Sequence, residues 1–285
     1  VHSGDATIVL PAQKIYTETE REIKDVGEKL SNALSITGPF NIQFLARDNK
    51  IQVIEINLRS SRTFPFISKV TGVNFIDICV DAFFKKGDYE IPTHDIPFVA
   101  TKVAQFSFAR ISGADPILHV EMASTGEVAC FGDNLEEAYL LGAMSVGDRI
   151  PKKGIFLSVG GDSNKQTFLE SAKLLETLNL PIYSTEKTTA FLKKNGIKAK
   201  MLYKIHDGKS PSILEYLEKR KIDLAINIPV EYTEVEINDG YKMRRFAVDH
   251  NITLLTDFKK AELFVKAITN RKLEDLPIKS WQEYV

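Results

Sequence analysis

Between residues 150 and 285, short apolar runs alternate regularly with stretches of helical periodicity, and few folds accommodate that pattern. The apolar runs are Ile155–Val159, Ile182–Thr185, Ala199–Tyr203, Leu224–Ile228 and Ile252–Leu255. Helical patterns lie between or after most of them. Strands that are joined through helices pair in parallel, with right-handed crossovers and helices on both faces of the sheet. The sequence therefore predicts a small doubly wound parallel α/β domain over residues 150–285.

The preceding segment is predicted as α+β, an antiparallel sheet with helices. Two runs with strand character, Asn41–Arg47 and Ile51–Arg59, are joined by the turn residues Asp48-Asn49-Lys50 and predict a hairpin. Helical spacing is present near 17–34, 75–84 and 135–144. Turn residues and charges gather at 147–154. We therefore place the boundary between two domains there, giving residues 1–149 and 150–285.

Charge and cysteine content exclude several classes of protein. The chain has 37 basic and 38 acidic residues and a net charge of −1, which argues against a nucleic-acid-binding protein. No apolar run approaches the ~20 residues of a membrane-spanning helix. The 2 cysteines lack metal-binding or redox spacing. The chain is therefore expected to reside in the reducing cytoplasm.

One face of the predicted hairpin collects groups that suit a metal and a phosphate. Side chains alternate along a strand, so Glu55, Asn57 and Arg59 are expected on one face, about 6.6 Å apart along the strand. Gln43, on the partner strand, is expected to point into the same space. Carboxylate and amide oxygens suit Mg²⁺ bound to a substrate phosphate, and a guanidinium suits the phosphoryl group. Arg62 follows three residues later.

The same pattern has an ordinary structural interpretation, because a solvated hairpin face often carries Glu, Asn and Arg. Ile54, Ile56 and Leu58 are expected to form the apolar opposite face, and Gln52 departs from the alternation. Spacing alone leaves both interpretations open.

A second group of polar residues follows the predicted parallel strands. Ligands of open α/β sheets bind beyond the carboxyl ends of the strands, where helix N-termini favour anions. The residues at these ends are Lys165, Thr185, Thr188, Lys204 and Asn227. They predict an anion site, with helix caps and turns as the alternative. No phosphate-loop motif of the GK[ST] or GxGxxG type accompanies Gly160-Gly161.

Several motifs along the chain resemble the large chain of carbamoyl-phosphate synthase. They are VHSGD at 1–5, GPFNIQF at 38–44, EINLRSSRTFPF at 55–66, ADPIL at 114–118 and EMASTGEV at 121–128. The run from Arg62 to Phe66 resembles the second ATP-grasp half, which phosphorylates carbamate. The resemblance implies that residues 1–149 are the C-terminal portion of that ATP-grasp domain.

The resemblance also assigns roles to residues. Metal ligands for Mg²⁺ or Mn²⁺ would be Gln43, Glu55 and Asn57. ATP contacts would be Val1, His2, Ser3, Gln43 and Glu55. Arg59 and Arg62 would orient the phosphoryl group during its transfer. The implied mechanism is electrostatic, with charge neutralisation and positioning of carbamate in line with the phosphoryl group, and it needs no nucleophilic side chain.

Residues 150–285 resemble the methylglyoxal-synthase-like regulatory domain that ends the same large chain. This implies that Lys165, Thr185, Thr188, Lys204 and Asn227 bind a nucleotide monophosphate effector such as UMP or IMP. Methylglyoxal synthase needs an acid after the strand that ends at 226–229, where this chain has none. Regulation is therefore favoured over catalysis. Val103 and Leu254 replace the acidic and tyrosine residues of an ornithine site, which predicts a weak or absent ornithine response.

Two functional hypotheses result. The first is a part of a carbamoyl-phosphate synthase, a ligase of pyrimidine and arginine biosynthesis, whose partners would be the remainder of the large chain, a glutamine amidotransferase small chain and further copies of itself. The second is a nucleotide-sensing module without catalysis. Because the chain opens at Val1 within a motif, we expect a lobe covering ATP to be missing and the chain alone to be inactive.

Overall fold

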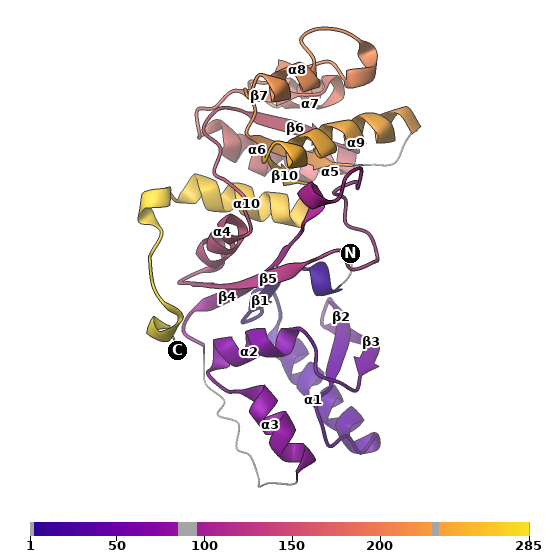
Figure 1. Cartoon of the computed structure of the whole chain (residues 1–285), viewed down its shortest axis with the longest axis vertical. Coiled ribbons are helices and arrows are strands. Elements are labelled where there is room, and N and C mark those ends of the chain that lie inside the picture. The colour runs from indigo at the N-terminus through magenta and orange to yellow at the C-terminus, as the bar shows by residue number, and fades with distance from the viewer. Residues whose placement is uncertain (1–2, 85–95, 230–233, 285) are drawn as a thin grey trace. The chain divides into compact units, whose positions relative to one another are not determined.

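The computed structural model describes residues 3–84, 96–229 and 234–284. The chain divides into two compact units, and most of their helices and strands are labelled in Figure 1. The larger unit comprises Val1–Thr7 and Thr101–Ile278, and the smaller unit comprises Ile8–Ala100 and Lys279–Val285. Each unit is described by itself below.

A parallel sheet of five strands organises the larger unit. Its strands are β6 (Ile155–Val159), β7 (Ile182–Ser184), β8 (Lys200–Met201), β9 (Leu224–Ile228) and β10 (Thr253–Leu255). They run in the order β10-β9-β6-β7-β8, and each neighbouring pair is parallel. The predicted doubly wound α/β fold is therefore confirmed, because β6 and β9 lie in the centre and the chain winds outward in both directions.

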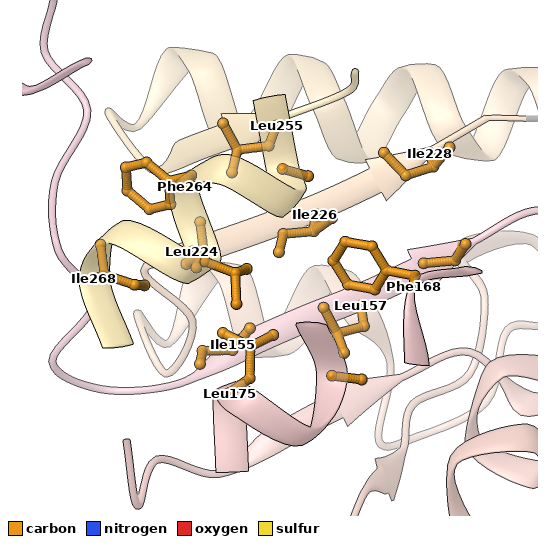
Figure 2. Close-up of a cluster of buried hydrophobic side chains, with 14 of the residues drawn as sticks. Ile155, Leu157, Phe168, Leu175, Leu224, Ile226, Ile228, Leu255, Phe264 and Ile268 are labelled. Carbon is orange, nitrogen blue, oxygen red and sulfur yellow. The ribbon is translucent and has the colours of Figure 1, made fainter. Parts of the chain in front are cut away.

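Helices cover both faces of this sheet. They are α5 (Asp162–Thr167), α6 (Leu169–Glu176), α7 (Glu186–Lys194), α8 (Ile213–Glu218), α9 (Glu234–Asp249) and α10 (Phe258–Asn270). Ile155 and Leu157 of β6 pack with α6 and α10 in one buried cluster, which Figure 2 shows. Phe156, between them in the sequence, packs with α8 and α9 in a second cluster. Alternation of side chains along the strand thus supplies both cores.

The segment that precedes the parallel sheet contributes to the same compact unit. It contains most of β4 (Val99–Gln105), from Thr101 onward, together with β5 (Gly126–Gly132) and α4 (Leu135–Ser145). The short 3-10 helices η1 (Ser3–Asp5) and η2 (Phe108–Arg110) also belong to it. Strands β4 and β5 are hydrogen-bonded neighbours. Val103 and Leu140 belong to the same buried cluster as the strands of the parallel sheet. The domain boundary predicted between residues 149 and 150 stays a prediction.

The smaller unit is built around a hairpin of β2 (Asn41–Arg47) and β3 (Lys50–Asn57). Asp48 and Asn49 adopt φ values of 51° and 57°, the left-handed conformation that a two-residue hairpin turn requires. The other elements are β1 (Ile8–Leu10), α1 (Thr17–Ala33), α2 (Thr63–Thr71), α3 (Phe75–Phe83) and the 3-10 helix η5 (Trp281–Glu283). The sequence did not predict α2. Pro65 lies in its first turn, where a missing N–H costs nothing.

Candidate functional site

A cavity of about 1200 Å³ opens at the carboxyl ends of the parallel strands in the larger unit. The cavity is lined by all five residues that were predicted at these strand ends, namely Lys165, Thr185, Thr188, Lys204 and Asn227. Four of them follow three different strands, and Asn227 lies within β9, so only the parallel topology brings them together. The cavity is therefore rich in hydrogen-bond donors, as an anion site requires.

Lys165 reaches the cavity from α5, which begins directly after Gly160-Gly161. Its side chain is 9% exposed, and its Nζ donates to Asp162 Oδ1 at 2.9 Å. The hydrogen bond from Lys165 lowers the pKa of the Asp162 carboxyl. Asp162 is fully exposed, so the buried ammonium group is held at the cavity wall by a carboxylate that remains in water.

The start of α7 forms another part of the cavity wall. Thr185 is the N-cap residue, but its side chain accepts no hydrogen bond from the first turn. The Thr185 hydroxyl donates instead to Thr188 Oγ1 at 3.2 Å, and both threonines are buried. Because Thr188 Oγ1 accepts that bond, its own hydrogen is available to a ligand. First-turn amides without a side-chain cap add further donors and a partial positive charge.

The loop after β8 places Lys204 and His206 at the cavity. The backbone N–H of Lys204 donates to Asp207 Oδ2 at 2.9 Å, which begins the 3-10 helix η3 (Ile205–Asp207). His206 Nδ1 lies 2.5 Å from Oδ2 of Asp239, a residue of α9, and both residues line the cavity. This pair was not predicted from the sequence, since 33 residues separate its members.

The hairpin brings together the three residues predicted as metal ligands. Gln43 and Glu55 are directly opposite in the antiparallel register, and Asn57 lies two residues after Glu55 on the same strand. Asn57 Nδ2 donates to Glu55 Oε1 at 2.9 Å, so these side chains share one face. The donor set is one carboxylate and two amide groups, hard oxygen donors of the kind that Mg²⁺ takes together with substrate phosphates. The residues thus fit the predicted metal.

A β-bulge corrects the predicted alternation of β3. The register passes from Gln43↔Glu55 to Phe44↔Val53 and leaves Ile54 as the extra residue. Gln52 therefore lies on the polar face with Glu55, which explains its departure from the pattern. The apolar face contains Val53 and Ile56 rather than the predicted Ile54, Ile56 and Leu58, because Ile54 is the bulged residue and Leu58 lies beyond the end of β3.

The structure also corrects the expected place of Arg59. Strand β3 ends at Asn57, so Arg59 lies beyond the strand and does not continue its face. Arg59 Nη1 donates to the carbonyl of Ser60 at 3.2 Å. Arg62 is the N-cap residue of α2. Of the predicted ATP contacts, Val1 and His2 lie outside the described residues, and Ser3 opens η1.

Two family models match separate parts of the chain. The model for the carbamoyl-phosphate synthase L chain, ATP binding domain, matches residues 1–82, and the model for the MGS-like domain matches residues 167–256. The chain is 45% identical over 277 residues to multifunctional protein ura1 of Schizosaccharomyces pombe, which covers 94% of this chain and 12% of that protein. The chain belongs to the carbamoyl-phosphate synthase large-chain family.

Other members of this family show the same relation. Multifunctional protein URA2 of Saccharomyces cerevisiae is 44% identical over 280 residues, covering 94% of this chain and 13% of that protein. The mitochondrial carbamoyl-phosphate synthase [ammonia] of Homo sapiens is 40% identical over 296 residues, covering 100% of this chain and 20% of that protein. The chain thus spans a fifth or less of the length of these relatives. Among the described helices, none has the length and apolar character needed to cross a bilayer.

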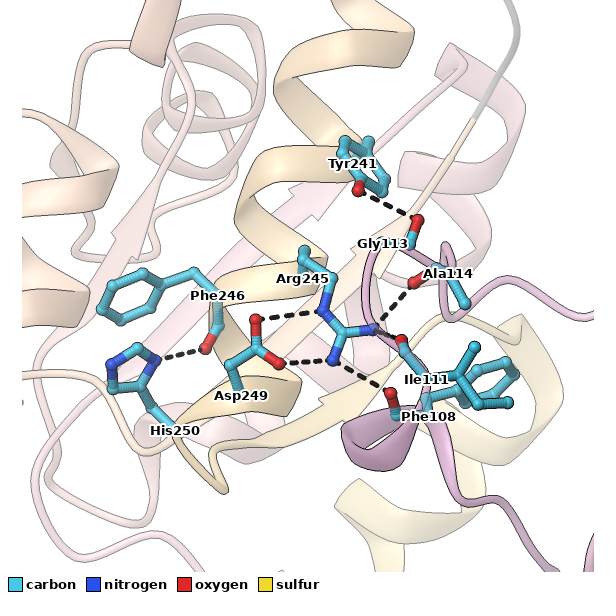
Figure 3. Close-up of polar contacts among 9 residues, drawn as sticks. All are labelled: Phe108, Ile111, Gly113, Ala114, Tyr241, Arg245, Phe246, Asp249 and His250. Carbon is cyan, nitrogen blue, oxygen red and sulfur yellow. Dashed lines mark hydrogen bonds and ion pairs between the residues drawn. The ribbon is translucent and has the colours of Figure 1, made fainter.

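One functional candidate lies between the two matched regions. Asp115, in the ADPIL motif, lines the cavity and forms two hydrogen bonds with Arg244 of α9. The role of Arg244 was not predictable from the sequence, because its partner is 129 residues away. The neighbouring Arg245 is not part of the cavity lining. It donates to the carbonyls of Phe108, Ile111 and Ala114, as Figure 3 shows.

Proposed function

We propose that the chain supplies part of a carbamate-phosphorylating site and a complete nucleotide effector site to a carbamoyl-phosphate synthase. The observation that carries the effector assignment is the convergence of Lys165, Thr185, Thr188, Lys204 and Asn227 on one cavity of about 1200 Å³. That volume suffices for a nucleoside monophosphate. The lysine and hydroxyl donors favour a phosphate group, and UMP or IMP is the proposed effector class.

The proposed contribution to catalysis is positioning and charge neutralisation. Gln43, Glu55 and Asn57 would hold Mg²⁺ or Mn²⁺, which supplies neutralisation of the ATP phosphates when it is bound. The Asn57 amide donates to Glu55 Oε1 and so fixes the orientation of both side chains on the hairpin face. Arg59 and Arg62 would stabilise charge on the phosphoryl group through their permanently charged guanidinium groups. Carbamate would be the acceptor, and carbamoyl phosphate the product.

The catalytic assignment is tested in the complete enzyme by measuring ATP-dependent carbamoyl phosphate synthesis. Glu55→Gln and Asn57→Asp are expected to lower the rate by about 10- to 100-fold, because each changes a proposed metal ligand. Gln52→Ala is the matched control, since Gln52 lies on the same face of the hairpin but is not a proposed ligand. Unchanged rates for both Glu55→Gln and Asn57→Asp would remove the metal assignment.

The effector assignment is tested by titration calorimetry with UMP and IMP. Lys204→Ala is expected to weaken binding by about 10- to 100-fold, the usual worth of a charge-assisted hydrogen bond. Lys219→Ala is the control, because Lys219 is exposed and follows α8 outside the cavity lining. If neither UMP nor IMP bound to the wild-type chain, the assignment would be refuted.

A second candidate function is a nucleotide-sensing module that performs no chemistry. It is favoured by one observation: every residue that lines the cavity belongs to the larger unit. Effector binding would then persist when the hairpin residues are altered. The proposed partners of the first function are the remainder of the large chain and a glutamine amidotransferase small chain, in the cytoplasm. Co-purification of the small chain with the complete enzyme would distinguish the two.

A further inference from the structure

The cavity contains a buried arginine for which neither the motifs nor the family comparisons give a role. Arg244 lies in α9 and is 2% exposed, yet it lines the cavity. Its Nη1 donates to Oδ1 of Asn227 at 2.9 Å. On the other side of the guanidinium, Nε donates to Asp115 Oδ1 at 2.8 Å and Nη2 donates to Asp115 Oδ2 at 2.5 Å. Arg244 therefore connects two residues of the cavity wall.

The contact between Arg244 and Asn227 determines which way the asparagine amide points. A guanidinium donates hydrogen bonds and cannot accept them, so the atom of Asn227 that faces it must be the carbonyl oxygen. The amide Nδ2 group of Asn227 is then the part that can serve a ligand. Without Arg244, rotation of the amide by 180° would present an acceptor instead, which repels a phosphate or carbonyl oxygen.

Asp115 makes Arg244 a poor direct ligand for an anion. The two hydrogen bonds between them form a bidentate pair, the strongest geometry for an arginine and a carboxylate. The positive charge is compensated within the wall, while Lys165 and Lys204 lie elsewhere on the lining. Gly240, one turn earlier in α9, leaves room for this arrangement, because a Cβ there would lie 2.6 Å from Arg244 Nη1.

We propose that Arg244 is a positioning residue of the effector cavity, which holds Asn227 as a hydrogen-bond donor toward an oxygen of the bound nucleotide. This inference rests on the proposed effector function. With its amide nitrogen facing the cavity, Asn227 is a hydrogen-bond donor like the lysines and threonines of the wall. The polar groups of the site then select a ligand rich in acceptor oxygens. The contribution of Arg244 to binding is then expressed through Asn227 and not through its own charge.

A double-mutant cycle on the whole chain, with UMP binding measured by calorimetry, tests this proposal. Arg244→Lys and Asn227→Ala are each expected to weaken UMP binding about tenfold. The double variant should lose no more than about tenfold, because Arg244 has nothing to position once the amide is gone. Losses that multiply to about 100-fold would overturn the proposal. Arg245→Lys is the matched control, since the adjacent guanidinium contacts loop carbonyls and Asp249 instead.

A second variant covers the case in which Arg244→Lys does not fold. Gly240→Ala keeps the arginine but displaces its guanidinium, and the alanine favours the helix. It should weaken UMP binding in the wild-type background and not in the Asn227→Ala background. Equal losses in the two backgrounds would overturn the proposal. Wild-type binding and the loss in Lys204→Ala report on the effector function itself, so failure of that function is separated from failure of the positioning role.

Discussion

The stability of the larger unit should depend on pH through Asp148, which follows α4. Burial raises the pKa of the Asp148 carboxyl from 3.8 to about 6, and the positive charge of Lys260 only partly offsets this effect. Burial likewise lowers the pKa of the Lys260 ammonium, while Asp257 and Asp148 oppose that change. Tyr139 lies in the same surroundings, and burial together with these carboxylates raises its pKa. Asp148 is thus an acid whose neutral form the fold prefers.

The sign and size of the effect follow from this difference in pKa. The folded chain retains the Asp148 proton between about pH 4 and pH 6, where the unfolded chain releases it. Stability from the neutral carboxyl is therefore fully present below pH 4 and is lost as the pH rises through 6. The pKa difference corresponds to a loss of about 2 to 3 kcal/mol in the free energy of unfolding above pH 6.

Asp148→Asn keeps the shape of the side chain and removes the titration. The variant should equal wild type near pH 4 and exceed it by about 2 to 3 kcal/mol at pH 7.5. Urea denaturation followed by circular dichroism between pH 4 and pH 8 measures the difference. Glu121→Gln, at an exposed carboxylate, is the control for a general change of charge. A difference between Asp148→Asn and wild type that does not vary with pH would refute the reasoning.

Three further substitutions should destabilise the larger unit, each measured by urea denaturation. Arg245→Ala leaves three loop carbonyls and Asp249 without their donor, and it should lower the free energy of unfolding by about 2 to 4 kcal/mol. A loss below about 0.5 kcal/mol would show that water replaces the guanidinium. Gly154→Ala should lower the free energy of unfolding by about 1 to 3 kcal/mol, because its Cβ would lie 2.5 Å from the Lys221 carbonyl oxygen. An unchanged free energy of unfolding would mean that the backbone shifts to relieve this contact. Asp5→Asn should lower the free energy of unfolding by about 1 to 3 kcal/mol, because the fully buried Asp5 carboxylate accepts from the backbone N–H groups of Ala123 and Ser124. The asparagine side chain has one carbonyl oxygen, so it can accept from only one of these two groups without repulsion. Unchanged stability would contradict this account.

Local patterns were sufficient for the elements of the parallel sheet. Ile155–Val159 and Leu224–Ile228 were predicted to the residue, because a buried central strand is a continuous apolar run bounded by turn residues. The hairpin strand Asn41–Arg47 was equally clear, since Asp48 and Asn49 tolerate the left-handed conformation of the turn. The polar residues at the strand ends were visible for the same reason, as they lie at the ends of these runs or shortly after them.

Contacts between distant segments were not visible in the sequence. The bulge at Ile54 shifts the face of every residue on one side of it, and it arises from the register with the partner strand. The pairs Asp115–Arg244 and His206–Asp239 join segments that are 129 and 33 residues apart. Sequence periodicity therefore determined which residues form strands and helices and which polar groups follow them. Only the tertiary structure decided the partners of those groups, because burial and hydrogen bonding between remote segments set the charge and orientation of each one.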